Sequence, residues 1–340
     1  MTHAILALNC GSSSLKYTLF DSAERRITSG LIEATGPAAI ATSLAEIAAS
    51  GLALSAIGHR VVHGGNRFTS PVLITPVIRQ HIEDLMPLAT EHQPHQVAGI
   101  DAMAKAFPGL PQVACFDTVF HRTIARERQE MALPGSFAAR GLLRYGFHGL
   151  SFHYIATQFP RGKVIACHLG NGCSVAAIEN GRSVYTSMGF TPIDGLMMGT
   201  RSGTLDPGAV LWLVDELGDS AAVRTLINKE AGLKGVSGIS ADMRQLLASR
   251  DPDAVFAIAM FVDRLVLEVG RAAAALQGVD TLVFTGGIGE NATAIRDSAL
   301  AKLAWLNATS HVIKTDEELM IAKSVRAVLA DHGKRSSPAE

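Results

Sequence analysis

The same pattern of strand, turn and strand occurs twice in this chain, once near the N-terminus and once near the middle. Apolar residues recur along each strand, and glycine with serine or asparagine fills the turns, which is typical of hairpins. The strands are Ala4–Asn9, Leu15–Phe20 and Arg26–Glu33 in the first copy, and Val164–His168, Ser174–Ile178 and Ser183–Ser187 in the second. Laying Gly11 over Gly170 brings the copies into register, so the sequence predicts two related sheets.

A second pair of segments extends this internal similarity. Gln112–Asp117 and Thr281–Thr285 are short apolar strands, and polar or glycine-rich residues follow each of them. We therefore match these two strands with each other. A chain of 340 residues is also longer than one hydrophobic core usually supports. Together these features predict a duplicated α/β fold of two lobes, with a nucleotide cleft between the copies.

Amphipathic or apolar patterns between the strands predict helices. These are Ala38–Ala49, Pro76–Met86, His95–Phe107, Ala209–Leu217, Ala221–Glu230, Asp253–Leu276 and Glu317–Ala330. Thr315 and Asp316 provide an N-cap signal for the last helix. The most apolar segment, Ala254–Val269, contains Asp263 and Arg264, so we expect a core helix there and no membrane span.

The charge and cysteine content exclude several classes of protein. A formal net charge of −1, without a run of like charges, lacks the field that nucleic acid or an anionic membrane requires. The four cysteines form no CxxC pair and lie in or beside apolar runs. We expect buried free thiols in a reducing compartment rather than disulfides or zinc ligands. The N-terminal apolar stretch is too short for a signal peptide, which favours a cytoplasmic location.

Three glycine-rich turns are candidates for phosphate binding, because backbone N–H groups can converge on an anion where no Cβ intervenes. They are Gly11–Lys16, His168–Gly172 and Gly286–Asn291. Each of the first two could equally be an ordinary hairpin turn, whereas the third follows a buried strand, where open α/β sheets bind nucleotides. None matches the Walker A pattern.

Two arginines lie among glycines and apolar residues, where a merely solvating charge is out of place. Arg60 lies within Gly58–Gly65 and Arg201 within Met198–Gly203. Phosphoryl transfer to a carboxylate brings two anions together, and guanidinium groups suit both. His148 could contact the phosphoryl group or satisfy a buried carbonyl, and Asp117 could act at Mg²⁺ or cap a helix.

These segments, in this order, resemble the acetate kinase family. Asn9–Lys16 is similar to the family's first signature and Thr191–Gly208 to its second. The resemblance implies the duplicated ribonuclease H-like, or actin-like ATPase, fold shared with sugar kinases and Hsp70. It also implies transfer of the γ-phosphoryl group of ATP to acetate, directly, in line and reversibly, in a homodimer.

The resemblance assigns roles residue by residue. Asp117, His148 and Arg201 would be catalytic, and Asn9 and Glu317 would hold Mg²⁺, which Mn²⁺ can replace. Acetate would contact Arg60, Val62, Leu88, Phe147 and Pro192. ATP would contact Lys16, His168, Leu169, Gly170, Asn171, Gly172, Asp242, Met243, Arg244, Gly287, Ile288, Gly289, Glu290 and Asn291. We expect an N-terminal lobe of residues 1–122 and 318–335 for acetate and Mg²⁺, and a C-terminal lobe of residues 123–317 for ATP and the dimer interface.

The chain departs from the family's pattern at several positions. Asp194 stands where the family has glutamate, Thr204 where it has aspartate and Phe152 where it has histidine, and Ala89–Glu91 is an insertion. Three alternatives therefore stay open beside acetate and ATP: propionate or another short-chain acid as acceptor, pyrophosphate as donor, and an actin-like scaffold.

Overall fold

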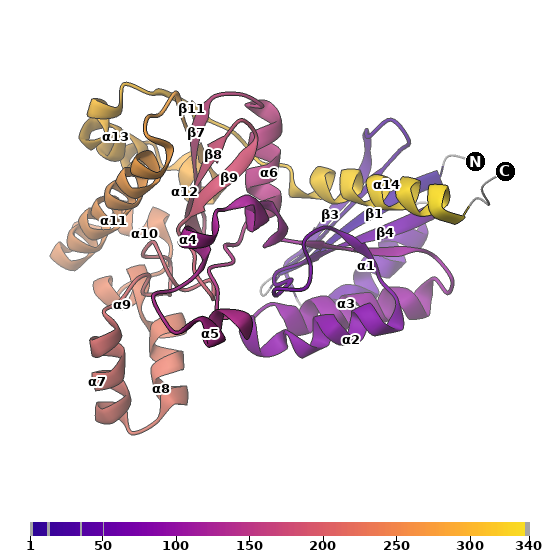
Figure 1. The fold of residues 1–340 in the computed structure, drawn as a ribbon, viewed down its shortest axis with the longest axis horizontal. Coiled ribbons are helices and arrows are strands. Elements are labelled where there is room, and N and C mark those ends of the chain that lie inside the picture. The colour runs from indigo at the N-terminus through magenta and orange to yellow at the C-terminus, as the bar shows by residue number, and fades with distance from the viewer. Residues whose placement is uncertain (1–2, 12–13, 35, 50, 337–340) are drawn as a thin grey trace. The chain divides into compact units, whose positions relative to one another are not determined.

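The computed structural model describes residues 3–11, 14–34, 36–49 and 51–336, and the chain divides into two compact units (Figure 1). Unit 1 comprises the described residues up to Val119 and from Asp316 onward, and unit 2 comprises Phe120–Thr315. Each unit is built on a mixed β-sheet.

The sheet of unit 1 has the strand order β3-β2-β1-β4-β6-β5. Its strands are β1 (His3–Cys10), β2 (Leu15–Phe20), β3 (Arg26–Ile32), β4 (Ala53–Val61), β5 (Val72–Leu73) and β6 (Gln112–Phe116). β1, β2 and β3 pair antiparallel, whereas β4 lies parallel to β1 and β6 lies parallel to β4. Parallel strands covered on both faces are continuously apolar, which explains the run Ala4–Leu8.

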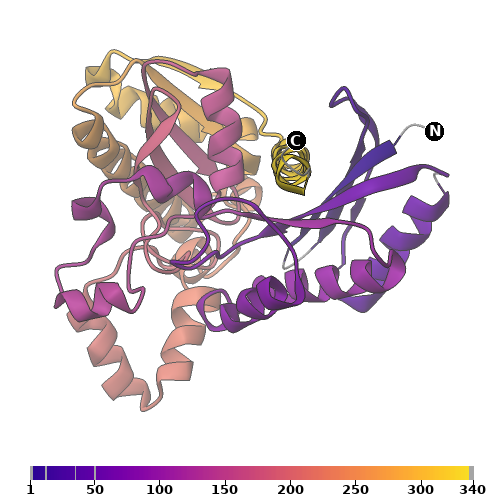
Figure 2. The same cartoon turned by 45° about the vertical axis from the view of Figure 1, so that its right-hand side comes forward.

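Helices cover both faces of this sheet. They are α1 (Pro37–Ala49), α2 (Pro76–Asp84), α3 (Gln93–Ala106) and α14 (Glu317–Ser336), with the 3-10 turn η1 (Met86–Leu88) after α2. Figure 2 shows α14, in yellow, on one face and the indigo and purple helices on the other. Leu8 of β1 packs with Ile40 of α1 and Met103 of α3. A Cβ at Gly58 would overlap with Ile321 of α14, so glycine in β4 allows that helix to approach the sheet.

The sheet of unit 2 has the strand order β11-β10-β7-β8-β9. Its strands are β7 (Lys163–Leu169), β8 (Cys173–Glu179), β9 (Arg182–Thr186), β10 (Thr281–Thr285) and β11 (Thr309–Val312). The long helix α11 (Pro252–Leu276) packs on β7, β8 and β9, and α6 (Gly149–Gln158) packs on β7. The remaining helices are α4 (Arg126–Gln129), α5 (Gly135–Ala139), α7 (Pro207–Leu217), α8 (Ser220–Thr225), α9 (Gly232–Ser237), α10 (Met243–Ala248), α12 (Gly286–Asn291) and α13 (Thr293–Lys302).

The two sheets share one topology, which confirms the predicted duplication. In each, three antiparallel strands, β1–β3 or β7–β9, are followed by two strands parallel to the first, β4 and β6 or β10 and β11. Our match of β6 with β10 was wrong. β10 lies next to β7 as β4 lies next to β1, so β4 is the counterpart of β10, and β4 was absent from the strands that we predicted.

The other sequence predictions agree with the structure in most respects. Each predicted helix is present within a few residues, except that α8 ends at Thr225 and the segment Leu226–Glu230 continues in π geometry. The cap of α14 is Asp316, whose Oδ1 accepts from the N–H of Leu319 at 3.0 Å. The four cysteines, Cys10, Cys115, Cys167 and Cys173, are buried and free. Among the described helices, none is long and apolar enough to cross a membrane.

Candidate active site

Four polar residues of unit 1 meet at one edge of its sheet. Asn9 lies near the end of β1, Arg60 near the end of β4, and Asp117 directly after β6. These three strands are parallel neighbours, so their carboxyl ends reach the same edge, where open α/β sheets bind ligands. Glu317, the first residue of α14, joins them from the helix.

Arg60 is the centre of this cluster. Its Nε donates to Asp117 Oδ1 at 3.2 Å and to Oδ2 at 3.1 Å, and its Nη2 donates to Asp117 Oδ2 at 2.6 Å. Its Nη1 donates to Asn9 Oδ1 at 3.2 Å and lies 3.6 Å from Glu317 Oε2. The side chains of Arg60, Asp117 and Glu317 are 15%, 1% and 13% exposed, so this is a nearly buried ionic network.

The neighbouring carboxylates keep the Arg60 guanidinium charged. Burial by itself would lower the pKa of Arg60, but the charges of Asp117 and Glu317 outweigh burial and raise that pKa above its ordinary value. The Arg60 guanidinium faces the carboxylates of Asp117 and Glu317. The structure therefore combines a fixed cation with two acidic side chains in one cluster.

A magnesium ion fits this donor set. Asn9 and Glu317 offer amide and carboxylate oxygens and are in direct contact, with Asn9 Nδ2 donating to Glu317 Oε2 at 3.2 Å. Mg²⁺ prefers a few such oxygens and completes its shell with water or phosphate. Among the described residues, no group of three or more His, Cys, Asp and Glu side chains could hold a metal ion.

The other predicted residues of unit 1 lie on or directly after three different elements of that unit. Val62 directly follows β4 and is buried, with its N–H donating to Gln96 Oε1 at 2.9 Å, whereas Leu88 ends η1 and is partly buried. Lys16 is exposed on β2, directly across from Asn9. Ser12 and Ser13 of the predicted phosphate turn lie outside the described residues.

Unit 2 contains a second cluster, around Gly172 at the β7–β8 turn. The rings of His148 and His168 stack with their centroids 4.2 Å apart. His148 Nδ1 is hydrogen-bonded to Ser174 Oγ at 2.8 Å, and His168 Nδ1 to Ser151 Oγ at 2.9 Å. His148 itself adopts a left-handed conformation, with φ 56°, as the N-cap of α6. Such a conformation is uncommon for a residue other than glycine and concentrates at functional sites.

Arg201 approaches the same glycine. A Cβ at Gly172 would lie 3.4 Å from Arg201 Nη1 and 3.5 Å from His148 Nε2, so both side chains converge on the open face of this residue. Arg201 Nη1 also donates to the carbonyl oxygen of Pro192 at 3.1 Å. The structure thus brings together His148, His168 and Arg201, while Phe147, next to His148, is buried.

The third glycine-rich turn lies beside the second one. Gly286, at the start of α12, has φ 79°, and a Cβ there would come within 2.8 Å of the Leu169 carbonyl oxygen. Only glycine permits this approach of the two turns. Glu290 Oε1 accepts from the N–H of Gly286 at 3.1 Å, and Asn291 Nδ2 donates to the Gly287 carbonyl at 2.8 Å. The sequence predicted a turn here, whereas Gly287–Asn291 is helical and is held by hydrogen bonds within α12.

The segment 242–244 begins α10 at the surface. Asp242 is its N-cap and accepts from the N–H of Arg244 at 2.9 Å, and the two side chains form an ion pair at 2.6 Å. The preceding residue, Ala241, lies beside Gly199, which in turn lies against the side chain of Asn171. This segment is thus linked to the Gly170–Gly172 turn through the loop that carries Arg201.

Comparison with known proteins gives the family. The model of the acetokinase family matches residues 34–327. The chain belongs to the acetokinase family. An acetate kinase from Rhodopseudomonas palustris is 42% identical over 399 aligned positions, covering 98% of this chain and 100% of that protein.

Solved structures of acetokinase relatives share the two-lobe fold. The crystal structure of Porphyromonas gingivalis acetate kinase is 33% identical, with a TM-score of 0.85, and covers 96% of this chain and 100% of that one. A propionate kinase from Francisella tularensis is 35% identical, with a TM-score of 0.87, and covers 95% and 98% of the two chains. The chain has the duplicated α/β, actin-like fold that the sequence predicted.

Sequence reasoning missed a buried histidine, His121. His121 Nε2 donates to the carbonyl oxygen of Phe147 at 3.0 Å, and its Nδ1 is hydrogen-bonded to Ser183 Oγ at 2.9 Å. Burial lowers the pKa of His121 to about 4, so the ring is neutral and holds the residue before His148. Its place four residues after Asp117 was the available signal. The ring of Phe152 packs edge-on against the ring of His121, with their centroids 5.6 Å apart.

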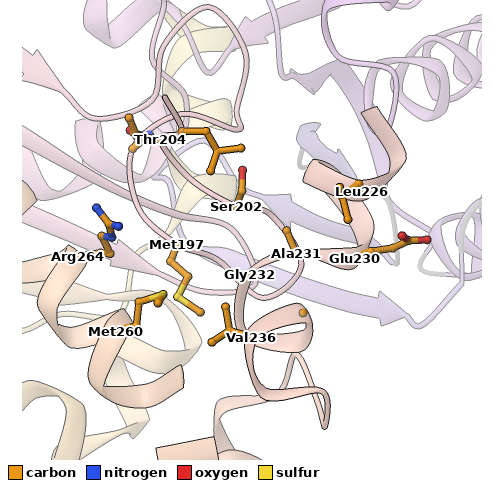
Figure 3. Close-up of a pocket in the computed structure, with 13 residues that line it drawn as sticks. Met197, Ser202, Thr204, Leu226, Glu230, Ala231, Gly232, Val236, Met260 and Arg264 are labelled. Carbon is orange, nitrogen blue, oxygen red and sulfur yellow. Dashed lines mark hydrogen bonds between the residues drawn. The ribbon is translucent and has the colours of Figure 1, made fainter. Parts of the chain in front are cut away.

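A pocket of about 360 Å³ is lined in part by Met197, Ser202 and Thr204, which belong to the same loop as Arg201 (Figure 3). Ser202, Thr204 and Gly232 line one part of it, and Met197, Met260 and Val236 line another. None of the residues that we predicted for acetate or ATP lines this pocket.

Proposed function

We propose that this chain transfers the γ-phosphoryl group of MgATP to acetate and releases acetyl phosphate and ADP. The observation that carries the proposal is the Arg60 network, in which a nearly buried guanidinium at the ends of three parallel strands is fixed by Asp117 and Asn9. A fixed, fully charged guanidinium is suited to binding a small carboxylate.

Unit 1 holds acetate and Mg²⁺ in this proposal. Arg60 binds the acetate carboxylate, and Asp117 fixes the guanidinium and is the catalytic aspartate. Asn9 and Glu317 hold Mg²⁺, or Mn²⁺ in its place, and the metal neutralises charge on the phosphate oxygens of ATP. The contact between Asn9 and Glu317, and the carboxylate of Glu317 beside Arg60, support these roles.

Unit 2 binds ATP and stabilises the transferred group. The turn His168–Gly172, the segment Asp242–Arg244 and the helical segment Gly287–Asn291 hold ATP in this proposal. The family resemblance also assigns Lys16 to ATP. His148 and Arg201 donate hydrogen bonds to the equatorial oxygens in the transition state. Their convergence on Gly172 supports this assignment, because it brings two side-chain donors to one glycine of the turn.

The reaction is a direct, in-line and reversible displacement. An acetate oxygen attacks the γ-phosphorus, the bond to the β–γ bridging oxygen breaks, and that oxygen leaves with the electron pair on ADP. No phosphoenzyme forms. Two arginines and Mg²⁺ offset the charges of the two anions that must approach each other.

Acetate is the preferred acceptor in this proposal. The family resemblance assigns Val62, Leu88, Phe147 and Pro192 to the methyl group of acetate. The relative titled a propionate kinase, similar across nearly the whole chain, keeps propionate as the second candidate. Pyrophosphate as the phosphoryl donor and a role as an actin-like scaffold are the remaining, less favoured candidates.

We also propose a cytoplasmic homodimer that associates through unit 2. On α7, Leu211 and Trp212 are 67% and 61% exposed, and large exposed apolar side chains of this kind favour an interface. Four buried free thiols suit a reducing compartment. Light scattering that gives the mass of one chain would contradict the dimer.

The test of the function is a hydroxamate assay for acyl phosphate. Purified protein is incubated with Mg²⁺ and ATP against acetate, propionate and butyrate, with Arg201→Ala as control. We expect acetyl phosphate from the wild-type protein and a large loss in the variant. Absence of acyl phosphate from all three acids, with ATP and then with pyrophosphate, would refute the proposal.

A further inference from the structure

Asp194 and Thr204, which flank the loop that carries Arg201, are in direct contact. Thr204 Oγ1 donates to Asp194 Oδ1 at 2.7 Å and accepts from the N–H of Gly195 at 3.0 Å. The N–H of Thr204 donates in turn to the Gly195 carbonyl at 3.0 Å. Asp194, Gly195 and Thr204 are thus joined by hydrogen bonds. We call these three residues the neck, because they hold together the two ends of the loop between them.

Arg144 fastens this neck to the sheet. Its Nη2 donates to Asp194 Oδ2 at 3.1 Å. Its Nη1 lies at hydrogen-bond distance from three successive carbonyl oxygens at the end of β9, namely Thr186 at 3.3 Å, Ser187 at 2.7 Å and Met188 at 3.0 Å. Asp194 therefore joins the loop to Arg144 through one oxygen and to Thr204 through the other.

The loop that this neck closes carries Arg201. The carbonyl of Pro192, two residues before Asp194, accepts from Arg201 Nη1 at 3.1 Å. Within the loop, the N–H of Met198 donates to the carbonyl of Arg201 at 3.1 Å. A shift of the neck would therefore move both the Pro192 carbonyl and the backbone of Arg201.

We propose that Arg144, Asp194 and Thr204 form a clamp that positions Arg201, and that the hydroxyl of Thr204 is matched to the carboxylate of Asp194. These are positioning residues, since they act through Arg201. The inference rests on the proposed function in that Arg201 acts on the transferred phosphoryl group. A misplaced donor loses transition-state stabilisation, so the clamp determines kcat more than KM.

Thr204 is a favourable place to test the clamp. It is exposed and lines the pocket of Figure 3, so its substitution opens no cavity in the core. Thr204→Val keeps the shape and removes the hydroxyl, whereas Thr204→Ser keeps the hydroxyl. The matched control is Thr42→Val, which removes a hydroxyl bonded to Ala38 O at 3.1 Å in α1, a helix that carries none of the site residues.

Kinetics distinguish the clamp from general weakening of the fold. We expect Thr204→Val to lower kcat about tenfold, with the KM values for ATP and acetate within about threefold of wild type. The variant loses the hydrogen bond from Thr204 to Asp194 that positions Arg201, and the loss of one such bond lowers the rate about tenfold. Thr204→Ser should restore kcat to within about threefold of wild type, and Thr42→Val should leave it unchanged.

A charged variant gives a pH signature that a passive structural role would not give. In Thr204→Asp, the new carboxylate faces the carboxylate of Asp194, in the place of the Thr204 hydroxyl. Arg144 pairs with Asp194, and Arg264 and Glu230 line the adjoining pocket. At low pH one shared proton restores the bond, so kcat should fall as pH rises, relative to wild type. Asp194→Asn combined with Thr204→Asp should remove this dependence, since an amide can donate to the new carboxylate and accept from Arg144.

Hydrogen exchange provides a readout that needs no activity. Peptides covering residues 192–204 should exchange faster in Thr204→Val than in wild type or Thr204→Ser. Wild-type kcat in Thr204→Val, or a wild-type pH profile in Thr204→Asp, would overturn the clamp. If the wild-type protein forms no acyl phosphate, the proposed function is refuted, and the clamp is then tested by hydrogen exchange alone. Unchanged exchange in Thr204→Val would overturn the clamp in that case.

Discussion

Replacing Arg60 with methionine should destabilise unit 1 because it leaves a carboxylate buried without its cation. Arg60 makes three contacts of 2.6 to 3.2 Å to Asp117, whose side chain is 1% exposed. Methionine keeps much of the aliphatic stem, so the change removes mainly the charge. Breaking a buried ion pair in this way costs about 3–5 kcal/mol. Since Arg60 is 15% exposed and water can reach the pair, we expect a loss of about 3 kcal/mol.

The assay is urea unfolding followed by far-UV circular dichroism. Both tryptophans, Trp212 and Trp305, belong to unit 2, so their fluorescence does not report directly on unit 1. At a slope of about 3 kcal/mol per molar urea, the Arg60→Met midpoint should fall by about 1 M. The control is Arg79→Met on α2, whose partner Asp101, at 2.7 Å, is half exposed. That variant should lose no more than about 1 kcal/mol.

The double variant decides the reasoning. Asp117→Asn removes the charge that Arg60→Met leaves unpaired, so the two changes together should cost about 2 kcal/mol less than the sum of the single changes. A loss below about 1 kcal/mol for Arg60→Met, or a strictly additive double variant, would show that the network contributes no stabilising charge pairing.

Three further predictions follow from the buried groups. Burial lowers the pKa of His59 and of His121 from 6.5 to about 4, so each ring takes up a proton on unfolding between these pH values. The free energy of unfolding should therefore fall by about 1.4 kcal/mol per pH unit for each histidine as the pH drops from 6.5 to 4, and it should reach a plateau above 6.5. Urea titrations from about pH 4 to 8 measure this change. Gly199→Ala should raise the KM for ATP at least about tenfold while leaving the KM for acetate within about threefold, because a Cβ would displace the Asn171 side chain; equal KM values for wild type and variant would refute this. Burial raises the pKa of all four cysteine thiols, so the folded protein should react with a thiol reagent at pH 8 only after denaturant is added.

The sequence by itself determined the local parts of this protein. The two hairpins, the long helix α11 and the glycine-rich turns are encoded in consecutive residues, because alternation, helical period and positive φ are properties of short segments. The resemblance to the family added the candidate residues, but it gave them no partners or distances. Even the correct expectation of two related sheets came from comparing one short hairpin with another.

Tertiary structure decided which of these parts are neighbours. It made β4 rather than β6 the counterpart of β10, because neighbouring strands are chosen by sheet pairing and packing rather than by their own sequences. Asn9 and Glu317 meet across 308 residues, and Arg60 and Asp117 across 57. Asp194 and Thr204 were two separate departures in the sequence and are one hydrogen-bonded pair in the fold. Spacing along a chain fixes no distance once the chain folds back on itself, so the chemistry of the site became defined only when helices and strands brought its residues together.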